Sequence, residues 1–126
     1  MVDLTSLLGA SKAPATQVLT LYIPDKDRNG KQIKNLSKWI REAQDVLTAI
    51  GGGSTSTSAN GTWMNPESGV IIREKTVIVY TYINADSFKK NFRRLREFVH
   101  RFGKETNQGE VAVLFAGMFY LVQKYD

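Results

Sequence analysis

The sequence predicts a single α+β domain whose elements follow the order β-α-β-β-α-β. Segments rich in β-branched and aromatic residues alternate with two segments whose apolar residues recur every three or four positions, the spacings of strands and of amphipathic helices. Two strand–helix–strand units joined through a central hairpin give a ferredoxin-like fold, a four-stranded antiparallel sheet with two helices on one face. The length of 126 residues and the hydrophobic content of 42% fit one domain with its own core.

Residues 1–16 predict an N-terminal arm in front of the domain, which we expect to span residues 17–126. Leu4, Leu7 and Leu8 have the spacing of a short helical turn, and a linker containing Ser, Ala and Pro follows them. We therefore expect the arm to dock through its leucines.

The first strand and the first helix are marked at both ends. Apolar and mixed residues alternate with a period of two over 17–23, and Pro24 ends this strand because proline cannot donate to a β-ladder. The helical spacing of apolar residues over 35–50 predicts an amphipathic helix. Asn35 is expected to cap its first turn, and Gly51 to supply the left-handed residue after its last.

The segment 51–69 has two interpretations. Its Gly, Ser and Thr residues are typical of a flexible linker. Alternatively, it contains a polar edge strand through Thr55, Thr57 and Trp63, which we favour because the following run needs a partner. That run, 70–83, is rich in β-branched and aromatic residues and predicts the longest strand, in the middle of the sheet.

A second helix is expected to start with Asp86 or Ser87 as its cap and to reach Phe102. Apolar residues recur in it at steps of four and three, and Gly103 would be the left-handed residue after its end. This helix carries most of the net charge of +5, because seven basic and three acidic residues lie between 84 and 106.

The last strand is expected at 111–122, with Gly117 as a bulge or a close approach. Both faces of this strand and of the long strand are apolar, so the sheet face away from the helices is too apolar to be left in water. A second copy of the chain, the N-terminal arm, or nucleic-acid bases could cover it. We favour a homodimer through this face, whose partner-binding residues would be Tyr22, Ile78, Tyr80, Tyr82, Met118 and Tyr120.

The basic helix is a candidate nucleic-acid-binding surface, because cations on one helix face can neutralise phosphates. We favour the other interpretation, a solvated helix face that keeps the protein soluble. The glycine–aromatic signature of RNA-recognition strands is missing from the long strand. The candidate contacts are Lys89, Lys90, Arg93, Arg94, Arg101 and Lys104.

Catalytic chemistry has few candidates in this sequence. Without cysteine and with one histidine, it excludes thiolate chemistry and multi-histidine metal sites. Asp25 and Asp27 could hold magnesium for a phosphodiesterase or nuclease, but we favour an ordinary turn for them. His100 is expected at the surface. The charges at 73–75, within an apolar strand, indicate a cross-strand pairing, which we favour, or a cleft at the mouth of the sheet.

These observations predict a non-catalytic binding or assembly module that self-associates through its open sheet face. Nucleic-acid binding by the helix 86–104 and a metal-dependent phosphodiesterase at Asp25 are the alternatives. We expect no cofactor, no bound metal and no membrane partner, and the absence of an apolar leader predicts a cytoplasmic protein. The sequence does not identify a small-molecule ligand.

Short motifs in the second half of the chain are Gly61-Thr-Trp63, the run from Gly69 to Lys75 that contains Ile-Ile-Arg-Glu, and Phe102-Gly-Lys-Glu105. In these segments the chain resembles a family of small bacterial proteins of unknown function. The resemblance implies the ferredoxin-like fold and supplies no activity.

Overall fold

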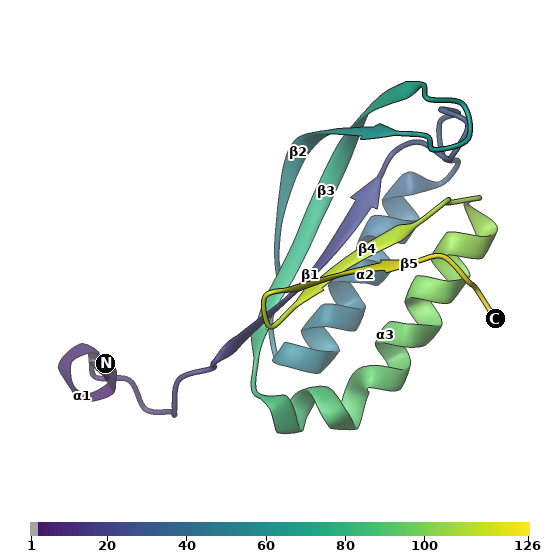
Figure 1. Ribbon diagram of the computed structural model, residues 1–126. Helices are drawn as coiled ribbons and strands as arrows, with labels where there is room; N and C mark the ends of the chain where they lie inside the picture. Colours follow the sequence, from purple (N-terminus) through teal and green to yellow (C-terminus); the bar gives the residue numbers. More distant parts are fainter. Residues whose placement is uncertain (1–2) are drawn as a thin grey trace.

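The computed structural model describes residues 3–126, apart from the side chains of Ala85 and Ser87. The fold is α+β, with one five-stranded antiparallel sheet and three helices (Figure 1). The elements are α1 (Thr5–Leu8), β1 (Gln17–Pro24), α2 (Leu36–Gly51), β2 (Thr55–Met64), β3 (Ile71–Ile83), α3 (Ala85–Glu105), β4 (Val111–Phe115) and β5 (Met118–Val122).

The strands lie in the order β2-β3-β1-β4-β5, and every neighbouring pair is antiparallel. The two long helices α2 and α3 cover the same face of the sheet, as expected (Figure 1). The prediction of four strands was wrong by one, because the last expected strand is two strands. We call the face away from α2 and α3 the open face.

The core lies between the sheet and the two long helices. Leu19, Leu21 and Ile23 of β1 point into it, and their register partners Thr81, Val79 and Val77 on β3 lie on the same face. On the helices the same spacing that predicted them places the buried residues, which are Trp39, Ala43, Leu47, Ile50, Leu95, Phe98, Val99 and Phe102. The helical spacing therefore identified most of the buried face of each helix, but on α3 it missed Phe98 and included Phe92, which is 50% exposed.

The segment expected as one bulged strand is a β-hairpin. Ala116 and Gly117 form a two-residue turn with φ of 53° and 77°, and Phe115 pairs directly with Met118 across it. Two consecutive positive φ values are typical of the tight turns that join paired strands, whereas a bulge would have left a single strand. The turn gives the sheet its fifth strand, β5, at one edge.

The second edge of the sheet is β2. The polar segment that could have been a linker forms ten residues of strand paired with β3 along their length, so the strand interpretation was correct. β3 therefore lies between β2 and β1, in the interior of the sheet, as its composition predicted.

The helix ends differ from the expected ones by a few residues. Asn35 precedes α2 with a left-handed backbone, φ 58°, and no side-chain capping hydrogen bond, so its predicted capping role was wrong. The left-handed residue after α2 is Gly52, not Gly51. The helix α3 starts at Ala85, after Asn84, and continues through Gly103 to Glu105.

The arm projects away from the domain (Figure 1). Its short helix α1 has no buried residue, and Leu4, Leu7 and Leu8 are exposed. The arm therefore does not cover the open face of its own sheet. Within the described residues, we find no helix with the length and apolarity that crossing a bilayer requires.

Candidate functional site

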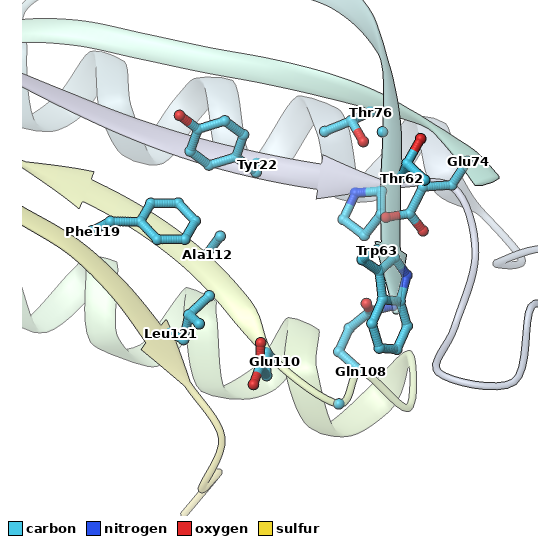
Figure 2. Close-up of a pocket in the computed structure, with 13 residues that line it drawn as sticks. Tyr22, Thr62, Trp63, Glu74, Thr76, Gln108, Glu110, Ala112, Phe119 and Leu121 are labelled. Carbon is cyan, nitrogen blue, oxygen red and sulfur yellow. The ribbon is translucent and has the colours of Figure 1, made fainter. Parts of the chain in front are cut away.

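A pocket of about 360 Å³ opens on the open face, near the ends of β1 and β2 (Figure 2). Side chains from β1, β2, β3, the loop before β4, and the β4–β5 hairpin meet there. The lining residues are Tyr22, Pro24, Gly61, Thr62, Trp63, Glu74, Thr76, Gln108, Gly109, Glu110, Ala112, Phe119 and Leu121. The pocket thus combines a mostly apolar wall with a few polar groups, which is the usual composition of a small-molecule site.

Glu74 is the unusual group in this pocket. Its Oε2 atom is buried and has no hydrogen-bond partner in the protein. Burial, followed by the negative charge of Asp25, raises the pKa of Glu74 to about 7, against the opposing effects of a Trp63 hydrogen bond and of Lys26. Near neutral pH this carboxyl group can therefore accept or donate a hydrogen bond.

The strand opposite Glu74 leaves space for its side chain. Gly61 is the register partner of Glu74 on β2. A methyl group at Gly61 would lie 2.8 Å from Thr76 Oγ1 and 3.4 Å from Glu74 Cγ. Glycine at this position therefore lets the carboxyl side chain lie across the neighbouring strand, within the pocket.

Three aromatic side chains from three strands form the walls of the pocket. Trp63 comes from β2, Tyr22 from β1 and Phe119 from β5 (Figure 2). The rings of Tyr22 and Phe119 pack edge to face, with centroids 6.0 Å apart. At this distance the two rings contact each other and form one continuous aromatic wall, and the position of Phe119 depends on the hairpin that forms β5.

The loop before β4 is fixed by Gln108, which is almost fully buried. Its side-chain Nε2 donates to the backbone carbonyl of Lys26 at 3.1 Å, and its backbone carbonyl accepts from Arg28 Nη2 at 2.9 Å. The hydroxyl of Tyr125 also donates to that carbonyl. These bonds tie the loop that follows β1 to the loop that precedes β4, so the polar rim of the pocket is held in place.

The sequence-predicted sheet-face residues are divided between the two faces. Tyr22 lines the pocket, while Ile78, Tyr80 and Tyr82 lie farther along the open face, in register with β1 and β2. Met118 and Tyr120 were assigned to the wrong face: they pair with Phe115 and Val113, whose side chains point toward the helices. The hairpin reverses the assumed alternation because Met118 is the direct cross-strand partner of Phe115, and such partners point to the same face of a sheet.

The predicted basic residues all lie on α3, on the helix-covered side of the sheet (Figure 1). All six are exposed, but Arg101 points toward α2, with its Nη2 atom 2.7 Å from Glu42 and its guanidinium over the Trp39 ring. The fold does not bring these cations to the aromatic pocket. Nucleic-acid binding by this helix stays a prediction.

The other candidate groups have structural partners. Asp25 Oδ1 accepts from the backbone N–H of Lys75, and Asp27 Oδ1 accepts from two N–H groups of its own turn. His100 Nδ1 accepts from the backbone N–H of Asp126. Within residues 3–126, no three His, Cys, Asp or Glu side chains are grouped as a metal site would require.

Sequence reasoning noticed Glu74 as a charge in an apolar strand and favoured a cross-strand pairing for it. The pocket agrees with the less favoured interpretation, a cleft. Sequence reasoning did not connect Glu74 with Phe119, Gln108 or Glu110. The motif Gly61-Thr-Trp63 held a usable signal, since a tryptophan two residues from a glycine on an edge strand indicates an open surface beside a ring. Gln108 carried no signal in the sequence.

No family model matches the chain, and no curated protein matches it. Solved structures do resemble it. A phage SAM lyase in complex with S-methyl-5'-thioadenosine has a TM-score of 0.67 at 10% identity, over 89% of this chain and 92% of that one. The same kind of enzyme in its apo state has a TM-score of 0.64, also at 10% identity, over 90% and 94%.

A Bacillus cereus protein related to NIF3 has a TM-score of 0.51 at 18% identity. The match includes 96% of this chain but only 31% of the Bacillus cereus protein, so it concerns one part of a longer protein. At these identities the three structures show that this chain shares their fold, and they show nothing more.

Proposed function

We propose that this protein binds a small molecule with a flat aromatic group, of the nucleoside class, in the pocket around Glu74. The observation that carries the proposal is the Glu74 carboxyl group in a pocket walled by aromatic rings: a Trp63 hydrogen bond acts on the group, but its buried Oε2 atom has no hydrogen-bond partner. A buried polar atom without a partner is costly, and a ligand donor would satisfy it.

Each part of the pocket has a role in this proposal. The Trp63 and Tyr22 rings offer faces and edges for stacking on a base, and Phe119 closes the far side. Glu74 accepts an N–H or O–H of the ligand, while Gln108 holds the rim. The fold shared with a phage SAM lyase that holds S-methyl-5'-thioadenosine supports the choice of a nucleoside.

Isothermal titration calorimetry with S-methyl-5'-thioadenosine and with adenosine tests the proposal. We expect saturable binding at pH 7 that Trp63→Ala and Glu74→Gln each weaken by about tenfold or more, the equivalent of one lost charge-assisted hydrogen bond or one stacked ring. Trp63→Phe keeps an aromatic ring and should therefore lose less affinity for the nucleoside than Trp63→Ala.

Glu67→Gln is the matched control, because Glu67 is an exposed residue of the turn between β2 and β3, outside the pocket lining. The proposal is wrong if neither nucleoside binds, or if Glu74→Gln and Glu67→Gln bind them equally well. S-adenosylmethionine as a third probe, with the products analysed, shows whether binding is accompanied by a reaction.

Self-association through the open face is a second candidate function. Tyr82 and Phe119, each 58% exposed, lie on that face, as do Val18 and Leu121. A second copy packed on them would remove this apolar surface from water. Light scattering of Tyr82→Ser and Leu121→Ser tests it: both variants should lower the average mass, and a wild-type protein that is monomeric at all concentrations contradicts it.

The similarity to the three solved structures also concerns the fold class. We infer that the elements from β1 to β4 form a ferredoxin-like unit, and that β5 is a strand added to its edge. The strand order β2-β3-β1-β4 and the two helices on one face support this inference.

A further inference from the structure

A second, more apolar hollow lies on the opposite side of the sheet, between α3 and the β4–β5 hairpin. We call it the α3–β5 groove. It has a volume of about 390 Å³. Its lining residues are Leu19, Phe88, Phe92, Leu95, Arg96, Val99, His100, Val113, Phe115, Tyr120 and Val122. This groove shares no lining residue with the pocket around Glu74.

The groove exists because the sheet is wider than its helical layer. Two long helices suffice to cover a four-stranded sheet, but here β5 adds a fifth strand beyond β4 at the edge of the sheet. The side chains of β5 that point to the helix side therefore meet no third helix. Phe92 on α3 and Tyr120 on β5 remain about half exposed on the two sides of the groove.

The arm carries an apolar surface that also lacks cover. Leu7 and Leu8 are 77% and 74% exposed, and Leu4 lies one helical turn before them. The hydrogen bonds that the structure gives for α1 join it to residues of the arm itself, such as Leu8 N–H to the Leu4 carbonyl and Ala10 N–H to that of Thr5. A leucine stripe on a preformed helical turn is the shape of a segment that docks in an apolar groove.

We propose that the arm of a second copy docks in the α3–β5 groove, where α1 supplies the missing third helix. The leucines would pack against Phe92 and Tyr120 on the two sides of the groove. Two exposed apolar surfaces of one chain then cover each other, which removes both from water.

A second copy is favoured over the chain's own groove by the course of the linker. Pro14 fixes its own φ and restricts Ala13 to extended conformations, so the linker resists folding back on the domain. The arm extends away from the domain accordingly (Figure 1). Exchange of an extended terminal segment between copies is a low-cost route to association.

The absence of cysteine from the chain allows a specific cross-linking test. One variant carries Leu7→Cys and a size tag, and the other carries Phe92→Cys without a tag. The two are mixed under oxidising conditions, and the mixed disulfide is measured. Arg41→Cys, at an exposed position of α2 outside the groove lining, replaces Phe92→Cys in the control mixture.

We expect the Leu7–Phe92 mixture to give at least about tenfold more mixed disulfide than the control, the factor that burial of one leucine contributes to affinity. Leu4→Ser together with Leu8→Ser, in a Leu7→Cys background, should remove that excess. Equal yields in the two mixtures would overturn the proposal. So would a Leu7→Cys/Phe92→Cys double variant that closes only its own disulfide while the mixture gives none, because the arm would then dock on its own domain.

Discussion

Gly103 lies directly against the ring of Tyr125: a methyl group at Gly103 would lie 2.2 Å from Tyr125 Cε1. The Tyr125 hydroxyl donates to the carbonyls of Gln108 and Val122, at 3.1 and 3.2 Å. The glycine within α3 therefore lets the C-terminal segment pack on the helix and hold the loop that carries Gln108. This explains why a residue expected to end the helix lies inside it.

We predict that Gly103→Ala destabilises the protein by about 1 kcal/mol, the cost of displacing the Tyr125 ring less the gain in helix propensity. Urea unfolding measures the effect. Gly53→Ala is the control, since a methyl group there meets no atom within 4 Å. In a Tyr125→Ala background the same substitution should become neutral or stabilising, and an unchanged penalty in that background would show that Tyr125 is not its cause.

The raised pKa of Glu74 predicts a pH dependence of stability. Between its ordinary value of 4.5 and about 7, the folded protein keeps a proton that the unfolded chain has released. The free energy of unfolding therefore decreases as pH rises through this window, by on the order of 1 kcal/mol once solvent screening of a half-buried group is allowed for.

Urea unfolding at pH 5 and pH 8 tests this prediction. Glu74→Gln should remove the decrease between the two pH values, whereas the exposed control Glu67→Gln should keep it. The same pH dependence in Glu74→Gln as in the unmodified protein would mean that another group is responsible.

The tight turn between β4 and β5 predicts opposite effects at its two positions. Ala116 has φ 53°, a conformation that asparagine and glycine adopt more readily than alanine. We expect Ala116→Asn to stabilise the protein by about 0.5–1 kcal/mol. Gly117→Val should destabilise it by about 1–2 kcal/mol, since a β-branched residue resists φ 77°. Thermal unfolding of both variants measures this, and a stabilising Gly117→Val would contradict the hairpin.

The pair of Arg101 and Glu42 joins the two long helices beside Trp39. Glu42 raises the pKa of Arg101, mainly through their hydrogen bond. Both side chains are partly exposed, so we expect Arg101→Gln to cost only about 0.5–1 kcal/mol. Arg101→Lys should recover part of this, because a lysine keeps the charge but not the planar group over the ring. Urea unfolding at low and at high salt separates the two contributions: the ionic part should diminish with salt.

The local patterns of the sequence determined where most elements lie. The alternation around Leu19 and Leu21 located β1, and the three- and four-residue spacings located α2 and α3 with their buried faces. These patterns suffice because the period of an element follows from its backbone geometry and needs no knowledge of distant residues.

The sequence also led to a wrong assignment where a distant partner was decisive. Gly117 fits a bulge or a turn equally well by its own chemistry. Only the pairing of Met118 with Phe115 makes it part of a hairpin, and this pairing moves Tyr120 to the helix side of the sheet. A shift between strand and turn changes the face of every later residue, so one local ambiguity produced two wrong site residues.

The sequence by itself determined the order of the elements from β1 to β4, the charge of α3 and the presence of an acidic residue within an apolar central strand. Only the tertiary structure decided that Glu74 meets Trp63 and Phe119 in one pocket, and that β5 and α3 line a groove. The physical reason is distance along the chain: strand register and loop contacts join residues tens of positions apart, and no local periodicity records which of them will be neighbours.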